Sequence, residues 1–279
     1  MGIWKDGAQV ALALGFDFDA ETLWLGRDPE NARRPGTLSM GAFGARVGVP
    51  EILQLLREEG LRATFFVPGW VAENWPQVAT SICEAEHEVG HHGYLHEWVK
   101  PDEPGRSEEV LVRGLEALDR VLGVRPTGYR SPAWEAGEDT LRLLVEYEFS
   151  YSSSFLDQIM PYRHRLDGRE TDLVEIPVSW TLDDAPWFLF SVRAPVRNIY
   201  PSCMVEEVWR EEFQAIYQKG GVVNLTMHPQ LIGRPSRILM LRRFLDFARS
   251  YPGVWIAAVG EVAAWWAERN PRGGGKCRG

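Results

Sequence analysis

Four of the six histidines in this chain fall between His87 and His96, and two of them, His92 and His96, have the spacing of metal ligands. Far upstream, Asp17 and Asp19 stand two residues apart. A His-x-x-x-His pair with a carboxylate from a distant segment can hold a divalent metal and leave one position open for water. The pattern therefore predicts a hydrolytic metal site.

Asp17 and Asp19 follow the short apolar run 10–16, which is typical of a buried strand. Residues two apart on a strand point to the same face, and two carboxylates so close repel each other unless a cation lies beside them. One carboxylate as metal ligand and the other as general base would resolve this conflict. The alternative is a pair of loop carboxylates that cap a backbone or are solvated. We favour the functional interpretation.

His92 and His96 are separated by Gly93, which disfavours a regular helix and favours a turn after a strand. Either geometry can bring both imidazoles to one metal. Two histidines and one aspartate suit zinc, cobalt or nickel alike, so the expected cofactor is one divalent ion of this group, zinc first. Exposed loop histidines are the alternative. We expect His87 and His91 to be structural, because His91 should point away from His92 on an extended strand end.

Other polar residues also stand near predicted strand ends. Arg130 could pair with a catalytic carboxylate and fix its orientation, although a surface arginine is the alternative. His228 suits a general acid, with a structural histidine as the alternative. The acidic turn 183–187 either shapes a substrate pocket or is a solvated loop, and the sequence leaves this open. The candidate substrate-binding residues are Tyr94, Trp134, Asp184 and Trp187.

Short apolar runs alternate with amphipathic stretches along most of the chain. The runs predict strands at 10–16, 63–67, 88–92, 126–130, 149–153, 173–180, 221–227 and 254–259. The stretches predict helices at 50–59, 71–85, 107–122, 140–147, 205–219, 239–250 and 261–269, with Ser107 as an N-cap. Residues 17–48 read as a polar, Gly-rich connection. This alternation favours an α/β fold, a distorted (β/α) barrel of about seven parallel strands, whose loops after the strands carry the chemistry.

The composition sets further bounds. The 279 residues, with 45% hydrophobic and 25% charged, suit one large domain over 1–270, followed by a flexible Gly-rich tail at 271–279. A net charge of −9 without a basic stripe argues against a nucleic-acid partner. Three scattered cysteines predict neither a disulfide framework nor a cysteine-based zinc site. No segment is typical of a secretory leader or a membrane span, so we expect a cytoplasmic protein without a membrane partner.

Together these motifs resemble the polysaccharide deacetylase family, whose domain is also called the NodB homology domain. The resemblance runs from about residue 10 to residue 259, and the motifs stand in the family's order: Phe16-Asp17-Phe18-Asp19, His92-Gly93-Tyr94-Leu95-His96, Arg130-Ser131-Pro132-Ala133-Trp134 and Leu225-Thr226-Met227-His228-Pro229. It implies that Asp17 is the base, that Arg130 steadies it, and that His228 is the acid. The implied metal ligands are Asp19, His92 and His96.

The first motif departs from the usual pattern of two adjacent aspartates, because Phe18 separates them. This form is similar to a cytoplasmic branch of the family with peptidoglycan deacetylase-like and allantoinase-like members, which often form homotetramers. The resemblance implies a homo-oligomeric hydrolase of non-peptide C–N bonds, acting on an N-acetylated carbohydrate or a related small amide. Opening of a cyclic imide or ureide is the alternative, and an inactive ligand-binding module on the same scaffold is a further one.

Overall fold

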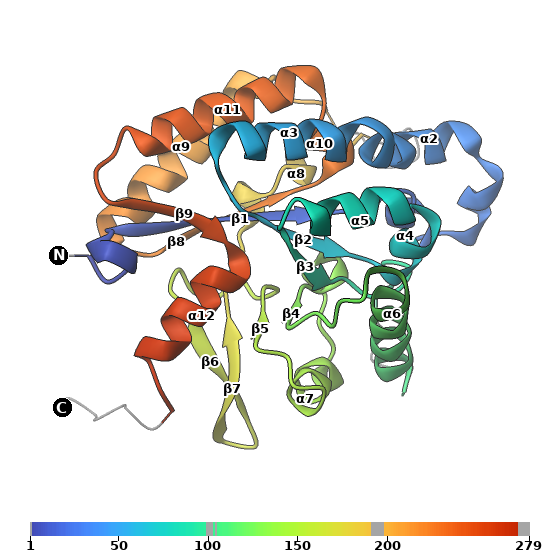
Figure 1. Ribbon diagram of the computed structural model, residues 1–279, viewed down its shortest axis with the longest axis horizontal. Helices are drawn as coiled ribbons and strands as arrows, with labels where there is room; N and C mark the ends of the chain where they lie inside the picture. Colours follow the sequence, from blue (N-terminus) through green and yellow to red (C-terminus); the bar gives the residue numbers. More distant parts are fainter. Residues whose placement is uncertain (1, 99–102, 104, 191–197, 273–279) are drawn as a thin grey trace.

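The computed structural model describes residues 2–98, 103, 105–190 and 198–272 (Figure 1). Nine strands form one sheet in the order β6-β7-β5-β4-β3-β2-β1-β8, and β9 pairs with β1. The strands are β1 Val10–Asp17, β2 Thr64–Val67, β3 Glu88–His91, β4 Gly128–Tyr129, β5 Tyr151–Ser152, β6 Tyr162–Leu166, β7 Arg169–Glu175, β8 Val222–Met227 and β9 Val254–Ala258. The fold is an α/β distorted barrel with a mostly parallel sheet, as predicted.

Strand β1 pairs with three other strands, and every one of its residues is buried. One edge pairs with β8, from Ala11↔Val222 to Phe16↔Met227. The other edge is shared, because β9 pairs with its first half and β2 with Gly15–Asp17. A parallel strand covered on both faces requires a continuous apolar sequence rather than an alternating one, which explains the run 10–14.

Helices cover the sheet on both sides (Figure 1). Helices α3, α9 and α11 lie along the upper side in that view, and α12 lies below. The helices are α1 Thr22–Leu25, α2 Pro35–Phe43, α3 Val49–Glu59, α4 Gly69–Asn74, α5 Pro76–Glu84, α6 Arg106–Leu122, α7 Glu138–Glu146, α8 Ala185–Phe188, α9 Ser202–Lys219, α10 Pro229–Ile232, α11 Pro235–Arg249 and α12 Val259–Arg269. None of these described helices is long and apolar enough to cross a bilayer.

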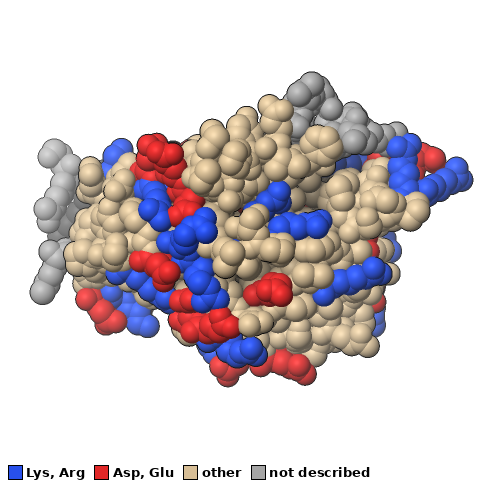
Figure 2. Space-filling view, turned by 90° about the horizontal axis from the view of Figure 1, so that it is seen from above, with Lys and Arg blue, Asp and Glu red and all other residues tan. Residues whose placement is uncertain are grey.

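Acidic and basic side chains lie side by side on the upper face of the molecule (Figure 2). Arg242 and Arg249 of α11 both donate to the carboxylate of Glu59 at the end of α3. Arg243 of the same helix donates to Glu206 of α9. These arginines and glutamates therefore form ion pairs between helices.

The stretch 17–48 is largely helical rather than a connecting loop. It contains α1, the 3₁₀ turn η2 (Pro29–Arg33), α2 and the π-helical turn η3 (Gly44–Gly48), which leads into α3. Its glycines allow close packing: a Cβ at Gly41 would lie 2.3 Å from the carbonyl oxygen of Ala20, and one at Gly48 would lie 2.1 Å from that of Pro229. Glycine serves here for backbone contact and not as a helix breaker.

Other element boundaries also differ from the prediction. The helix expected at 71–85 is two helices, α4 and α5, because Pro76 cannot continue the hydrogen-bond ladder of a helix interior. Helix α6 begins at Arg106 with Gly105 as its N-cap, so Ser107 lies inside the first turn. The strand expected at 173–180 ends at Glu175.

Strand β6 was not predicted. It forms an antiparallel hairpin with β7 and is half exposed. An exposed antiparallel strand can have a polar sequence, so β6 has no apolar run from which a strand could be predicted. Among the described strands, eight are joined in parallel and one, β6, is antiparallel. The prediction was about seven parallel strands. Cys83 and Cys203 are free thiols, while Cys277 and the predicted tail beyond Arg272 lie outside the described residues.

Candidate active site

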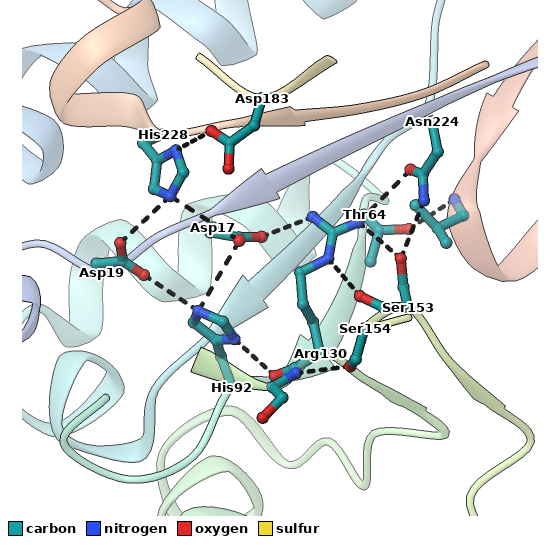
Figure 3. A network of polar contacts seen from close by, with 12 residues as sticks. Asp17, Asp19, Thr64, His92, Arg130, Ser153, Ser154, Asp183, Asn224 and His228 are labelled. Atoms are coloured by element: carbon teal, nitrogen blue, oxygen red, sulfur yellow. Dashed lines mark hydrogen bonds and ion pairs between the residues drawn. The ribbon is translucent and has the colours of Figure 1, made fainter. Parts of the chain in front are cut away.

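Five of the six polar residues predicted to carry chemistry, Asp17, Asp19, His92, Arg130 and His228, come together at the carboxyl ends of the strands (Figure 3). The sixth, His96, lies beside them, with Nε2 3.9 Å from Asp19 Oδ1. Asp17 is the last residue of β1, and His92, Arg130 and His228 directly follow β3, β4 and β8. Asp19 and His96 lie two and five residues beyond the ends of β1 and β3. Parallel strands end at the same edge of a sheet, which is why motifs from distant parts of the chain meet here.

Asp19, His92 and His96 form a buried group whose ligand atoms all lie within 4.8 Å of one another. Asp19 Oδ1 lies 3.4 Å from His92 Nε2 and 3.9 Å from His96 Nε2. Two ligands of a tetrahedral ion at about 2.1 Å would lie about 3.4 Å apart. Asp19 Oδ1 and His92 Nε2, which face each other, are buried without a hydrogen-bond partner. Buried polar atoms are rarely left in this state, so this donor set fits a divalent metal.

The orientation of His92 supports the same interpretation. Its Nδ1 lies 2.7 Å from the carbonyl oxygen of Arg130, which can only accept, so Nδ1 carries a proton and donates it. This contact leaves Nε2 to face Asp19, the usual arrangement of a metal-binding histidine. Burial lowers the pKa of His92, but the charges of Asp17 and Asp19 outweigh it and raise that pKa. The position of Nε2 therefore attracts a cation.

Four of the eight non-glycine residues with positive φ in the described part of the chain lie in the loops of the site. Ala20, His96, Ala133 and Trp134 all have positive φ values, 46°, 58°, 53° and 59°. L-residues adopt this region rarely and at a cost of about 1–3 kcal/mol each, and such residues cluster at active sites. His96 adopts this conformation in the loop after β3, and its Nε2 lies 3.9 Å from Asp19 Oδ1.

Asp17 is held by Arg130, whose side chain is fully buried. Arg130 Nη1 donates to Asp17 Oδ1 at 2.8 Å, and its other nitrogens donate to the carbonyl and the hydroxyl of Ser153. Gly15 makes room for this guanidinium, since a Cβ there would lie 2.9 Å from Nη1. The other carboxylate oxygen, Asp17 Oδ2, lies 3.9 Å from His92 Nε2 and 4.0 Å from His228 Nε2. Asp17 thus has one fixed oxygen and one oxygen facing the site.

His228 is held from behind by the acidic turn that follows β7. Asp184 accepts hydrogen bonds from His228 Nδ1 at 2.6 Å and from its backbone N–H at 3.1 and 3.2 Å. Asp183 Oδ1 lies 3.7 Å from the same Nδ1. Burial lowers the pKa of His228, but the charges of Asp184 and Asp183 outweigh it and raise that pKa well above the ordinary value. These contacts favour the protonated form of His228, and its Nε2 is directed at Asp17 and Asp19.

Residues 42–152 match the family model described as polysaccharide deacetylase. The chain is also 32% identical over 289 residues to the peptidoglycan deacetylase of Helicobacter pylori, an alignment that covers 95% of this chain and 98% of that protein. The chain belongs to the polysaccharide deacetylase family. It is accordingly a hydrolase of carbon–nitrogen bonds other than peptide bonds.

Solved structures agree with this assignment. A structure from Mycobacterium smegmatis assigned to the polysaccharide deacetylases is 41% identical, with a TM-score of 0.91, and the match covers 96% of this chain and 94% of that one. The Puue allantoinase structure is 22% identical, with a TM-score of 0.83 and coverage of 96% and 93%, which shows a shared fold.

The remaining histidines of the deacetylase motif region are structural, as predicted. His91 Nε2 donates to the carbonyl of Leu111, and its Nδ1 accepts from the N–H of Gly93, so both ring nitrogens are satisfied. His87 lies against Phe65 at the other end of β3, away from Asp19, His92 and His96. Burial lowers the pKa of His91 to about 3 and that of His87 to about 4, so both are neutral at physiological pH.

A cleft of about 530 Å³ adjoins the site in this deacetylase. Trp98 and Trp180 line it with side chains that are nearly half exposed, and Trp134 stands behind Trp180 with ring centroids 4.2 Å apart. Ala133 and Ala185 also line the cleft, so it borders the loop that carries Arg130 and the turn that carries Asp184, the partner of His228. Trp98 and Trp180 were missed because nothing local distinguishes them among twelve tryptophans.

Two of the four predicted substrate-binding residues face elsewhere. The Tyr94 hydroxyl donates to Glu73 and its ring lies beneath the guanidinium of Arg113, so it packs between α4 and α6. Asp184 is fully buried behind His228 and orients it. Trp134 supports the cleft wall, and Trp187 packs edge-on against Tyr200, a residue of the cleft.

Several residues of the site were not among the predicted ones. Ser153, at the end of β5, and Asn224, inside β8, both contact the guanidinium of Arg130. An asparagine within the otherwise apolar run 222–227 was the available signal, because a buried amide requires partners. Phe18, the residue that departs from the usual family motif, is fully buried in the core and does not face the site.

Proposed function

We propose that this protein is a metal-dependent N-deacetylase of an amino sugar carried on a short saccharide. The observation that carries the proposal is the placement of two buried, unpartnered ligand atoms, Asp19 Oδ1 and His92 Nε2, between a carboxylate held by an arginine and a protonated imidazole. Asp19, His92 and His96 would hold the metal, with zinc, cobalt and nickel all suited to the donor set. When bound, the metal would supply Lewis acidity that activates water and polarises the amide carbonyl.

The protein's own residues account for the proton transfers. Asp17 accepts the proton of the attacking water through Oδ2, while Arg130 fixes the carboxylate through Oδ1. His228 Nε2, which is protonated and 4.0 Å from Asp17 Oδ2, donates a proton to the departing nitrogen. The backbone N–H near Ala133, in its left-handed turn, would stabilise the oxyanion.

The cleft supports the choice of substrate class. Its volume of about 530 Å³ exceeds what a small cyclic amide fills, and two half-exposed indoles offer flat faces for a sugar ring. Opening of a cyclic imide or ureide remains the second candidate, because the same acid, base and metal ligands would serve it and the allantoinase structure shares this fold.

A substrate panel distinguishes these activities. Purified protein would be incubated with N-acetylglucosamine and its oligomers, with allantoin and with simple cyclic imides, and release of acetate or ring opening would be measured. Acetate release that increases with oligomer length supports the proposal, whereas turnover confined to the cyclic amides overturns it. Asp17→Asn is the matched control, since it should abolish turnover and leave the metal content unchanged.

Metal analysis of the purified protein tests the cofactor and identifies the ion. One equivalent of a divalent metal supports the enzyme, and no metal together with no turnover would favour an inactive ligand-binding module. Oligomeric state by light scattering tests the homotetramer that the family resemblance implies.

A further inference from the structure

Gln230 is a buried polar residue that no motif includes. It lies in α10, two residues after His228, and only 2% of its surface is exposed. Its Nε2 lies 3.3 Å from Asp19 Oδ2. Because a carboxylate oxygen can only accept, the amide nitrogen rather than the amide oxygen must face Asp19.

This contact makes the two oxygens of Asp19 unequal. Oδ2 accepts from Gln230 and has His228 Nε2 at 3.7 Å. Oδ1 faces the imidazoles of His92 and His96 and has no hydrogen-bond partner. A carboxylate free to rotate would present either oxygen to the imidazoles, whereas a donor fixed on Oδ2 keeps Oδ1 turned toward them.

We propose that Gln230 is a positioning residue that turns Asp19 Oδ1 toward the metal by donating to Oδ2. The proposal rests on the proposed function, in which Asp19 is a metal ligand. Groups that hydrogen-bond to metal ligands commonly set metal affinity by holding the ligand in its binding orientation.

The packing of α10 seats Gln230 for this role. The π-helical turn η3 lies directly against α10, and a Cβ at Gly44 would stand 2.9 Å from the backbone nitrogen of Gln230 and 3.1 Å from its Oε1. Gly44 is therefore required for the approach. π-helical turns are rare and occur often beside functional sites.

The oxygen of the Gln230 amide indicates that this residue serves the site rather than the stability of the fold. Gln230 Oε1 is buried without a hydrogen-bond partner. A leucine at this position would remove one hydrogen bond together with one unsatisfied acceptor, so the fold should tolerate it with little loss. The hydrogen bond from Gln230 Nε2 to Asp19 explains why a glutamine, with its unsatisfied oxygen, stands at this buried position.

The test is the affinity of the metal-free protein for Zn²⁺, measured by competition with a chromophoric chelator. In Gln230→Leu we expect the dissociation constant to rise about 10–100-fold, the range typical for a partner of a metal ligand. The melting temperature of the metal-free variant should stay within a few degrees of that of the wild type.

Gln9→Leu is the matched control, because Gln9 precedes the opposite end of β1 and donates to the carbonyl of Tyr217. It loses an amide hydrogen bond of the same kind and should keep the wild-type affinity for Zn²⁺. Gly44→Ala should weaken Zn²⁺ binding in the same direction as Gln230→Leu, because its methyl group would displace Gln230.

Wild-type affinity in a folded Gln230→Leu variant would overturn the positioning role and leave the proposed metal site intact. An equal loss of affinity in Gln9→Leu would also overturn it, since the effect would then be a general loss of stability. A wild-type protein that binds no Zn²⁺ would overturn the proposed function and this inference together.

Discussion

Asp184→Asn would remove the negative charge nearest to His228 without changing the size of the side chain. Asp184 is fully buried and accepts from His228 Nδ1 at 2.6 Å. The asparagine oxygen can still accept from Nδ1, but the second atom becomes an NH₂ group that faces the backbone N–H of His228, 3.1 Å from the native Oδ2. The variant therefore preserves the position of the ring approximately and weakens its attraction for a proton.

The magnitude follows from the strength of that contact. A hydrogen bond to a charged group contributes about 1.5–3 kcal/mol, and one pKa unit corresponds to about 1.4 kcal/mol. The pKa of His228, which is raised well above its ordinary value in the native protein, should then fall by about 1–2 units. His228 must be protonated to act as the acid, so activity is lost as the pH rises through its pKa. The alkaline limb of the kcat profile should move down by the same 1–2 units.

The assay is kcat against pH from 5 to 10 with the substrate that the panel identifies. The acidic limb should not move, because it reports the base rather than His228. Asp183→Asn is the control: its carboxylate lies farther away, at 3.7 Å from Nδ1, and burial raises the pKa of Asp183 to about 7, so it is only partly charged at neutral pH. A smaller shift is expected there. An alkaline limb that stays in place in Asp184→Asn would refute the role of His228 as the acid.

Three further outcomes are expected. Dialysis against a chelator should abolish turnover, with recovery on adding Zn²⁺, and His92→Ala should weaken Zn²⁺ binding by at least about 100-fold, because it removes a ligand rather than a ligand's partner. Trp180→Ala should raise KM for the oligosaccharide about 2–10-fold and leave kcat unchanged, because it removes about 0.5–1.5 kcal/mol of stacking. Trp265→Ala on α12 is the control and should leave KM unchanged. The free energy of unfolding should fall as the pH drops below 6.5, because the pKa values of buried His91 and His87 are lowered to about 3 and 4 and the unfolded chain takes up protons first. The slope, measured by denaturant unfolding, should decrease by about 1.4 kcal/mol per pH unit in His91→Gln, and an unchanged slope would contradict a neutral buried His91.

The sequence was sufficient to predict the residues that end the strands. The apolar run of β1 and the polar residues that follow it are both local features, and the parallel order of the strands brings Asp17, His92, Arg130 and His228 to one edge of the barrel without further information. The structural role of His91 was also predictable, because adjacent residues on a strand end point to opposite faces.

Contacts between loops could not be predicted from the sequence. Asp184 meets His228 because Asp183 forms a bridge with Thr226 of β8, and no local pattern fixes that register. The helical form of 35–48 depends on glycines that pack against the backbone of Ala20 and Pro229, partners that are distant in sequence. The same glycines, taken locally, indicate a loop.

Burial of charge links these contacts to the proposed metal. Four carboxylates, those of Asp17, Asp19, Asp183 and Asp184, lie within the site, and each is at most 3% exposed. They face the guanidinium of Arg130 and the imidazolium of His228, and the charge of Arg237 also acts on Asp184. The buried carboxylates still outnumber these cations, and uncompensated burial of charge is costly. A dication balances that excess. In the metal-free protein, protons take the place of the dication. Burial raises the pKa of Asp183 to about 7. Burial lowers the pKa of His92, but the neighbouring carboxylates outweigh it and raise that pKa. Metal binding should therefore release protons and weaken as the pH falls, and Zn²⁺ titration in dilute buffer with no proton release would contradict this balance.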